Sequence, residues 1–395
     1  MERPEYLKYH SLIKENCELV KDFGTAFINK YPNINILCIV KNGAFYIKKF
    51  IDYHKEVGVE AFIFLDNGST DHTLEIVSKY DCVKVLSNKL PYKMYWHHFK
   101  RFLFEEYGTN CWNLILDIDE FFEGPFNNDI SLKELVDYNN KNNYTAVVTH
   151  MVDLLPNENI LSKERNINFL ESHQYYSTQN LNVKPYRSII KTNKIYNNDI
   201  NFYTNGWRDA TFAVGEIMLT KHSFIKGDKK LMYTHDHFVD NSTVADYSCI
   251  LKHYKFHDNF SQYVSDSVLE GNHYDNSKEY VLYQKKIDEN KELNLYNKQM
   301  FNINDKDKLI ENKLMQISSS LLLYFYEIRN ERFPHFLKES IESNKTYKTL
   351  LVEKNCELEL EIIGLKNSIL LIKNSWTWKI ARFMTKLLGK ILKKE

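Results

Sequence analysis

The stretch that decides the fold spans residues 34–66 and reads INILCIVKNGAFYIKKFIDYHKEVGVEAFIFLD. Its two mainly apolar ends, 34–40 and 60–66, predict strands. Between them, residues 44–58 show an amphipathic helical pattern that ends at Gly58, and glycine commonly closes a helix. A strand, a helix and a second strand at this spacing predict a βαβ unit with parallel strands.

The same alternation continues along the chain. After a turn, helices are expected at 74–80 and 93–107, and strands at 82–87, 114–119 and 146–152. The expected fold class is therefore α/β, with a Rossmann-like, mainly parallel sheet flanked by helices and a helical C-terminal extension.

Beyond this alternation the pattern becomes irregular. Residues 153–235 are rich in Asn, Lys and Tyr, with further strands expected at 187–196 and 217–225. Residues 243–300 and 305–395 are expected to be helical.

The length of the chain suggests one large domain with additions. Its 395 residues exceed the range of roughly 250–300 over which a single core keeps growing. We expect a helical leader at 1–32, the main domain at 33–300, a helical extension at 301–372 and a basic amphipathic helix at 373–395.

The formal net charge is zero, but the charge is unevenly distributed. Residues 373–395 are strongly basic, which leaves the rest of the chain acidic and excludes an overall basic surface for nucleic acid. The six cysteines form no C-x-x-C pair, which favours free thiols in a reducing compartment over a structural zinc site. Neither a signal region nor a long apolar run is visible, so we expect a cytoplasmic protein without a membrane-spanning helix.

Two aspartates, Asp117 and Asp119, stand at the end of the strand expected at 114–119, and residues 120–125 are expected to leave the sheet. Side chains two apart on a strand share a face, and the carboxyl ends of strands in open α/β sheets are where ligands bind. Two such carboxylates repel each other unless a cation lies between them, and hard oxygen ligands favour Mg²⁺ or Mn²⁺ bound to a nucleotide phosphate. The alternative is a pair of exposed strand-end carboxylates without a ligand.

The turn DNGSTDHT at 66–73 follows a strand and opens a helix. Ser69 or Thr70 is expected to cap this helix, with Asp71 in its first turn. Asp66 would then offer a free carboxylate at the sheet edge to a base or ribose. A capped turn without a ligand explains the same residues.

A family resemblance is carried by two stretches, CIVKNGAFYIKKFIDYHKEVGVEAFIFLDNGSTDHT and WNLILDIDEFF. They resemble the family-2-type glycosyltransferases of GT-A fold, in particular a bacterial branch with a D-N-x-S-x-D turn and a D-x-D-E-F strand. Later segments, including TNGWRDATF, IMLTKHSFI, THDHF and the H-Y-K stretch, are similar to the later landmarks of that branch. The resemblance covers residues 34–288.

The resemblance implies roles for individual residues. A divalent ion, Mn²⁺ or Mg²⁺, would be held by Asp117, Asp119 and His253. The donor nucleotide would contact Val40, Lys41, Asp66, Asp71, Asp117 and Lys255.

Inverting enzymes of this fold need a carboxylate base to deprotonate the acceptor hydroxyl. By position in the fold the base would be Asp209, with Asp153 and Glu216 as rivals, and each of these is equally explained as an ordinary loop acid. Donor phosphate or acceptor would be bound by Arg208, Lys221 and His235, which are equally explained as surface residues.

The implied function is metal-dependent, inverting transfer of a sugar from a nucleotide-sugar, with UDP-sugars favoured, to a lipopolysaccharide, capsule or lipid-linked glycan. Two alternatives stay open. A nucleotidyl- or phosphotransferase would use the same paired aspartates, and a non-catalytic, membrane-tethered scaffold would have kept only the fold.

Two adjacent histidines, His97 and His98, fall in the helix expected at 93–107. Neighbouring residues point to different faces of a helix, so these rings are expected to pack rather than share a metal ion.

The C-terminal segments predict two kinds of partner. Residues 347–372 carry apolar side chains at alternating spacings of four and three, which predicts a short coiled coil and a homodimer; packing on the chain's own domain is the alternative. Residues 373–395 combine a basic face with an apolar face, as in helices that lie on anionic membranes; a helix packed on the protein is the alternative. We expect a peripheral location on the inner face of the cytoplasmic membrane, with surface contacts from Trp376, Trp378, Lys379, Arg382, Phe383, Lys386 and Lys390.

Overall fold

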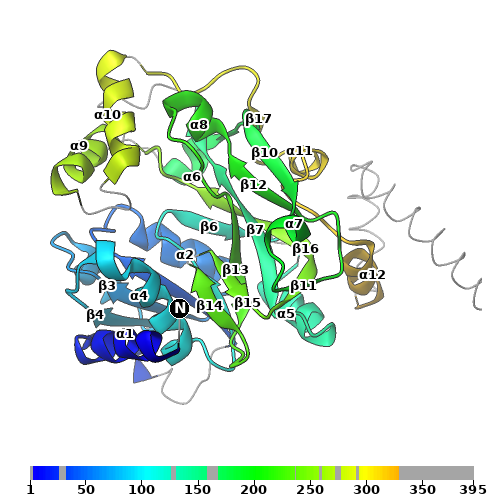
Figure 1. Ribbon diagram of the computed structural model, residues 1–395, viewed down its shortest axis with the longest axis horizontal. Helices are drawn as coiled ribbons and strands as arrows, with labels where there is room; N and C mark the ends of the chain where they lie inside the picture. Colours follow the sequence, from blue (N-terminus) through cyan, green and yellow to red (C-terminus); the bar gives the residue numbers. More distant parts are fainter. Residues whose placement is uncertain are drawn as a thin grey trace, which may run out of the picture. The chain divides into compact units, whose positions relative to one another are not determined.

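The computed structural model describes most of the chain (Figure 1). The chain divides into two units, Met1–Ser318 and Ser319–Glu395. Of the second unit, only α12 (Ser319–Ile328) is described. The predictions for 347–372 and 373–395 therefore lie outside the described residues, which are 3–25, 33–125, 130–157, 168–235, 237–257, 260–271, 277–290 and 293–328.

The first unit is built on a ten-stranded mixed sheet (Figure 1). The strand order is β1-β4-β3-β2-β5-β13-β7-β16-β11, and β6 pairs with β16. The bounds of these strands are β1 (Glu18–Lys21), β2 (Ile34–Val40), β3 (Ala61–Asp66), β4 (Val83–Ser87), β5 (Trp112–Ile115), β6 (Glu120–Glu123), β7 (Ala146–Asp153), β11 (Lys194–Ile195), β13 (Thr220–Lys226) and β16 (Thr243–His253).

The parallel half of the sheet consists of β4, β3, β2 and β5. Every residue of β2 and β3 is buried, which explains why both strands are mainly apolar along their whole length. The connecting helix α2 (Ile47–Val57) ends at Gly58, whose φ of 112° lies in the left-handed region that favours glycine. The expected βαβ unit and the α/β fold class are confirmed.

Helices α1 (Arg3–Glu15) and α4 (Tyr92–Tyr107) pack against each other and cover this half of the sheet. Ile13 of α1 and Phe99 of α4 are fully buried in one apolar cluster with Leu37 of β2. Full burial of such a side chain contributes about 1.5–3 kcal/mol, so this cluster fixes α4 on the sheet. The position of α4 matters because one of its lysines reaches the candidate site.

The other half of the sheet brings distant segments together. Strand β13 lies between β5 and β7 and runs antiparallel to both. Strand β16 runs parallel to β7 and antiparallel to β6, so that His253 at its end faces Glu120 on one side and Asp153 on the other. This pairing places residues far apart in sequence at the edge where β5 ends.

Smaller elements surround this sheet. The short strands form three further sheets: β8 (Leu155–Pro156), β9 (His173–Tyr176) and β17 (Phe301–Asn302); β10 (Leu181–Pro185) and β12 (Asn201–Asn205); and β14 (Met232–His235) and β15 (Phe238–Asp240). The remaining helices are α3 (Thr73–Val77), α5 (Leu132–Lys141), α6 (Phe169–Ser172), α7 (Tyr186–Ile189), α8 (Trp207–Phe212), α9 (Phe260–Glu270), α10 (Lys278–Glu289) and α11 (Lys306–Glu311).

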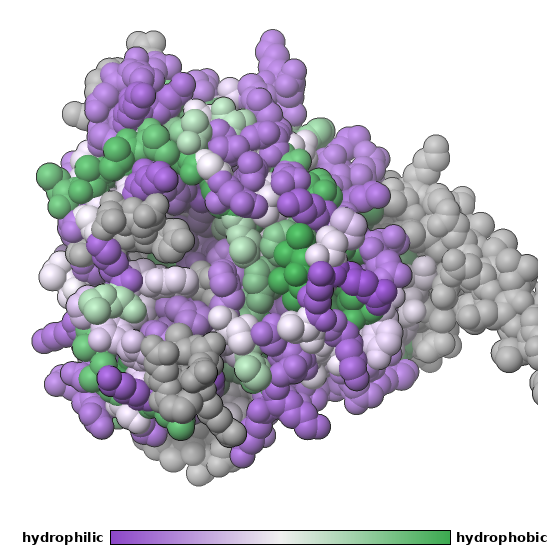
Figure 2. All heavy atoms as spheres, in the orientation of Figure 1, coloured by the Kyte–Doolittle hydropathy of each residue, from purple (hydrophilic) through white to green (hydrophobic). Residues whose placement is uncertain are grey.

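The surface is mainly hydrophilic on the face shown in Figure 2, with apolar side chains in small groups. Within the described part of the chain, no helix is long and apolar enough to cross a membrane.

Several local predictions are wrong. The strand expected at 114–119 ends at Ile115, and residues 120–123 return to the sheet as β6 instead of leaving it. The reason is a tight turn, in which the Glu120 N–H donates to the Asp117 carbonyl over 3.0 Å. Asp117 and Asp119 therefore lie on this turn and not on a strand.

Other segments have a secondary structure that differs from the predicted one. Residues 243–253, expected to be helical, form β16, nearly all of which is buried between its neighbours. The expected helical leader contains β1 as well as α1, because β1 adds an edge strand to β4. The strand expected at 187–196 is helix α7 followed by β11, and 312–318 separates two helices within a segment expected to be wholly helical.

Candidate active site

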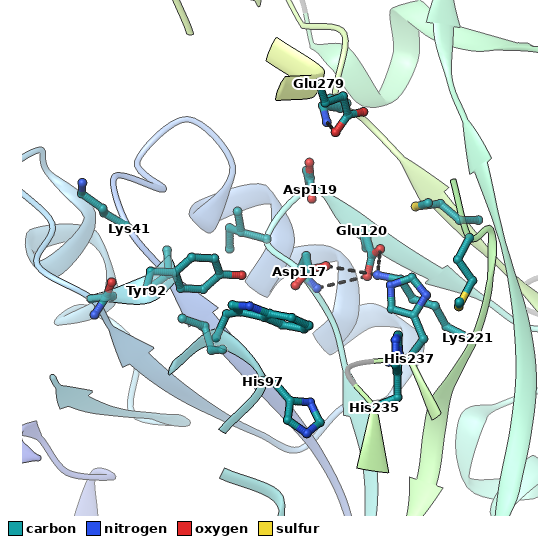
Figure 3. A pocket seen from close by; sticks show the side chains of 18 of the residues that line it. Lys41, Tyr92, His97, Asp117, Asp119, Glu120, Lys221, His235, His237 and Glu279 are labelled. Carbon is teal, nitrogen blue, oxygen red and sulfur yellow. Dashed lines mark hydrogen bonds and ion pairs between the residues drawn. The ribbon is translucent and has the colours of Figure 1, made fainter. Parts of the chain in front are cut away.

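A cleft of about 2310 Å³ opens where β2 and β5 end (Figure 3). Val40 and Lys41 line it from the end of β2, and residues 117–120 line it from the turn after β5. Further walls come from α4, from the hairpin of β14 and β15, and from the N-terminal end of α10. This is the sheet edge at which the sequence predicts a ligand site.

Asp117 is held by two lysines. The Nζ atom of Lys100, from α4, lies 2.8 Å from Oδ1, and that of Lys221, from β13, lies 3.1 Å from Oδ2. Both lysine side chains are only 6% exposed, whereas 38% of the Asp117 side chain is exposed. Although burial favours the neutral acid, Lys100 and Lys221 hold the pKa of Asp117 well below its usual range. The charge that compensates this carboxylate is thus supplied by the protein itself.

Glu120 joins the same cluster and was not among the predicted site residues. One carboxylate oxygen lies 2.5 Å from Lys221 Nζ, and the other accepts the backbone N–H of Asp117 over 3.1 Å. Burial raises the pKa of Glu120, which is 1% exposed. The D-x-D-E order contains a signal for Glu120, but nothing local in the sequence links Lys100 to Asp117.

Asp119 belongs to a second chain of charged groups. Its Oδ2 lies 3.2 Å from Nε2 of His253, and Nδ1 of His253 lies 2.6 Å from Asp153 Oδ1. The second oxygen of Asp153 accepts from Arg208 Nε over 2.8 Å. Burial lowers the pKa of His253, but the two carboxylates outweigh this effect and raise the pKa to about 9.

The pair of Asp119 and His253 fits a divalent cation. Asp153 holds Nδ1 of His253, which is the usual contact of a metal-binding imidazole, whereas Nε2 lies against Asp119 and would have to release its proton to bind a metal ion. Asp117 fits less well, because both of its oxygens carry lysine partners. In the described ranges, no group of three or more His, Cys, Asp or Glu side chains could hold a metal ion. An ion at Asp119 and His253 would therefore take its other ligands from a bound molecule or water.

Arg208 and Lys255 are both predicted site residues, and α10 connects them. Glu279 lies 3.2 Å from Lys255 Nζ and 3.1 Å from Arg208 Nη1, and it also accepts a hydrogen bond from the Tyr283 hydroxyl. The Lys255 ammonium lies 4.8 Å from the centroid of the Tyr280 ring. Burial opposes the charge on Glu279, but Lys255 and Arg208 hold its pKa well below the usual range. No local signal in the sequence marks Glu279 as a site residue, because its two charged partners, Arg208 and Lys255, are distant in the chain.

Asp66 does not offer the free carboxylate that the sequence analysis expected. It is 2% exposed, and its oxygens accept the backbone N–H groups of Gly68 and Ser69 over 3.1 and 3.2 Å. Gly68 has a φ of 82°, which permits this turn. Asp66 therefore shapes the loop after β3 and is not among the residues that line the cleft.

The Asp71 carboxylate is likewise engaged in hydrogen bonds that hold the surrounding loops. It accepts hydrogen bonds from the Ala44 N–H and from the N–H and hydroxyl of Thr73, and so ties the loop after β2 to the loop after β3. Helix α3 begins at Thr73, so the predicted cap at Ser69 or Thr70 is wrong. Lys41 does line the cleft, where it pairs with Glu270.

The three candidate bases occupy different environments. Asp209 accepts hydrogen bonds from Asn180 and Asn205 and does not line the cleft. Asp153 is buried between Arg208 and His253. Glu216 is exposed and lines the cleft.

The remaining wall of the cleft contains one predicted site residue, His235, beside residues that were not predicted to be functional. His97, assigned to packing in the sequence analysis, lines the cleft, as do His235 and His237 on the facing hairpin (Figure 3). His235 was predicted to bind the phosphate of the sugar donor or the sugar acceptor. Aromatic residues of α4, Tyr92 and Trp96, line the same wall.

Comparisons with known proteins give only distant similarities. No family model and no curated protein matches the chain. Among solved structures, S. aureus TarS 1–349 is 12% identical over 76% of this chain and 74% of that chain, with a TM-score of 0.29. The same fragment in complex with UDP-GlcNAc is 12% identical over 76% of this chain and 75% of that chain, with a TM-score of 0.29. A longer TarS structure is 12% identical over 76% of this chain and 45% of that chain, with a TM-score of 0.28. Superpositions with TM-scores this low support no conclusion about activity.

Proposed function

We propose that this protein is a metal-dependent, inverting glycosyltransferase that uses a nucleotide-sugar donor. The proposal is carried by one observation: at the carboxyl ends of the parallel strands of the mixed sheet, Asp119 faces the Nε2 atom of His253, whose Nδ1 is fixed by Asp153. This geometry suits a divalent ion that shares its coordination with a diphosphate. The family resemblance of the sequence agrees with this role.

The residues around this pair have complementary tasks in the proposal. Asp119 and His253 would hold the ion, which when bound would offset negative charge on the departing diphosphate. Lys255 and Arg208, which face the cleft and already contact Glu279, would attract the phosphates. Lys221 would contribute less, because it is engaged by Asp117 and Glu120.

The nucleoside would lie beside Val40 and Lys41 at the end of β2. Asp66 and Asp71 would support this part of the site indirectly, since both hold the loops that form it. A bound nucleotide would compete with Glu270 for the ammonium group of Lys41.

The catalytic base must reach the acceptor hydroxyl within hydrogen-bonding distance and must not be committed to another cation. Glu216 is the candidate supported by its position on the cleft wall. Asp209 and Asp153 remain candidates that would have to exchange their present partners. A glycan acceptor at a membrane, contact through 373–395 and a homodimer through 347–372 complete the proposal.

Thermal stability with candidate donors tests this function, because a ligand that binds only the folded state raises its stability by about 2.7 kcal/mol at 100 times Kd. The screen covers UDP, UDP-GlcNAc, UDP-glucose and UDP-galactose, each with and without Mn²⁺. We expect one or more nucleotide-sugars to raise the melting temperature only with Mn²⁺, and Asp119→Asn and His253→Gln to lose this increase.

The control variant Asp52→Asn, which changes an exposed carboxylate on α2, should keep the increase. Release of UDP from a sugar donor supports glycosyl transfer, whereas release of pyrophosphate from a nucleoside triphosphate would support nucleotidyl transfer instead. If no nucleotide stabilises the protein, or if Asp119→Asn responds like the unaltered protein, the proposal fails.

A further inference from the structure

The cleft continues beyond Asp117 along a second wall, which we call the basic arm. It is formed by α4 and by the connection from β13 through β14 to β15 (Figures 1 and 3). In Figure 3, His97, His235 and His237 lie on one side of Asp117, whereas Lys41 and Glu279 lie on other sides. The residues of the basic arm used below are Tyr92, Trp96, His97, Arg101, Glu105, Lys229, Lys230, His235 and His237.

Charge distinguishes the basic arm from the rest of the cleft. Near Asp117 and Asp119, each buried cation faces a carboxylate within 3.2 Å; these cations are Lys100, Lys221, Lys255 and Arg208. In the basic arm, Arg101 pairs with Glu105 over 3.0 Å. Lys229 and Lys230 also line the arm, and among the described residues neither ammonium group has an ion-pair partner. Asp228 lies next to these two lysines and accepts the backbone N–H of Lys230, so the turn at 228–230, with two lysines and one aspartate, carries a net charge of +1.

Aromatic and histidine rings are grouped along the basic arm. Trp96 and His97 have ring centroids 5.6 Å apart, and His97 lies 6.3 Å from the Tyr233 ring at an interplanar angle of 28°. On the hairpin, the rings of His235 and His237 are 5.7 Å apart and nearly perpendicular. Aromatic faces pack well against the apolar faces of sugars and polyols.

We propose that the basic arm binds the acceptor, and that the acceptor is an anionic saccharide or polyol chain carrying phosphate or carboxylate groups. This inference rests on the proposed function, since it names the class of acceptor for the same cleft. The aromatic and histidine side chains contact the carbohydrate, and the lysines at the rim contact its anionic groups. From the basic arm, the bound acceptor extends towards Asp117 and Asp119, so that one of its hydroxyl groups reaches the part of the cleft where the sugar donor binds.

The alternative is an acceptor of neutral sugar. A neutral chain would gain from the aromatic wall but not from Lys229 and Lys230, and its binding would be nearly insensitive to salt. Attraction between an anionic chain and these exposed lysines is screened over about 8–10 Å at physiological ionic strength, so binding of an anionic chain must weaken as salt is added.

Binding of three matched oligomers to the full chain tests the proposal. The probes are a glycerol-phosphate oligomer, an oligogalacturonate and a maltooligosaccharide of equal length, measured by calorimetry at 50 and 300 mM NaCl. We expect at least one of the two anionic probes to bind about tenfold more tightly than the neutral probe at the lower salt concentration, and to lose most of this preference at the higher one. The response to the phosphate probe and to the carboxylate probe identifies which anionic group is recognised.

Two variants locate the interaction. Lys229→Gln/Lys230→Gln should weaken binding of the preferred anionic probe about tenfold, whereas Lys133→Gln/Lys191→Gln removes the same charge outside the cleft and should have no effect. Equal binding of neutral and anionic probes, or an equal response of the two double variants, overturns the proposal. Nucleotide-sugar stabilisation of the unaltered protein, measured in parallel, separates this failure from failure of the proposed function.

Discussion

The substitution Asp117→Asn tests the central electrostatic feature of the site, the neutralisation of Asp117 by Lys100 and Lys221. If two neighbouring carboxylates simply repelled each other in the metal-free protein, removing one charge would increase stability. In the structure, the carboxylate is held by two buried lysines at 2.8 and 3.1 Å, so removing its charge must decrease stability. The sign of the change therefore distinguishes the two explanations.

The expected magnitude follows from the burial of the three side chains. Breaking a fully buried ion pair costs about 3–5 kcal/mol, whereas an exposed pair contributes about 0–1 kcal/mol. The two lysines are 6% exposed, but 38% of the Asp117 side chain faces solvent in the cleft, and Lys221 keeps Glu120 as a partner. We therefore expect Asp117→Asn to lower the free energy of unfolding by about 2–3 kcal/mol.

Urea unfolding of the protein without metal or nucleotide measures this change, with the free energy extrapolated to water. A double-mutant cycle with Lys100→Met isolates the pair and should give a coupling energy of about 1–2 kcal/mol. The control Asp137→Asn, which changes an exposed carboxylate on α5, should change stability by less than about 0.5 kcal/mol. An increase in stability on Asp117→Asn, or a coupling energy near zero, would refute the reasoning.

Two further predictions concern α10 and the response to acid. Glu279→Gln should lower the free energy of unfolding by about 1–3 kcal/mol in the same urea assay, because two buried cations lose a charged partner; Glu289→Gln, on the exposed end of the same helix, should have almost no effect. His54 bonds the Phe50 carbonyl through Nδ1 and accepts the Phe122 N–H at Nε2, which requires a neutral ring, and burial lowers its pKa to about 3. Since the folded pKa lies below the unfolded value of 6.5, the unfolded state binds more protons between these values and stability falls as pH is lowered from about 6.5 towards 3. Unfolding measured between pH 7 and 5 should show a slope that is smaller by up to about 1.4 kcal/mol per pH unit in His54→Gln, and equal slopes would contradict this assignment.

Local patterns in the sequence were sufficient for the first half of the fold. The segment 34–66 predicted a strand, a helix ending at Gly58 and a parallel strand, and all three are present. The reason is that β2 and β3 are buried on both faces and α2 on one face. The spacing of apolar residues along each segment therefore indicates its secondary structure. The position of Asp117 and Asp119 beside a cleft at the sheet edge follows from the same local order.

The strands of the second half of the sheet could not be predicted from local sequence patterns. Residues 243–253 became a strand because they pair with β6 and β7, and the apolar pattern of such a buried segment does not separate strand from helix. The turn after Ile115 likewise depends on the return of the chain as β6 beside β16.

The sequence by itself therefore determined the α/β alternation and the presence of acidic residues where β5 ends. Only the tertiary structure decided what those acids contact: Lys100 arrives on α4, Lys221 on β13 and His253 on β16, each placed by the burial of a different element. A periodic pattern records which face of one element is buried, but it carries no information about which other element supplies the partner. For this protein, that partner decides whether a carboxylate is available to a metal ion or already neutralised.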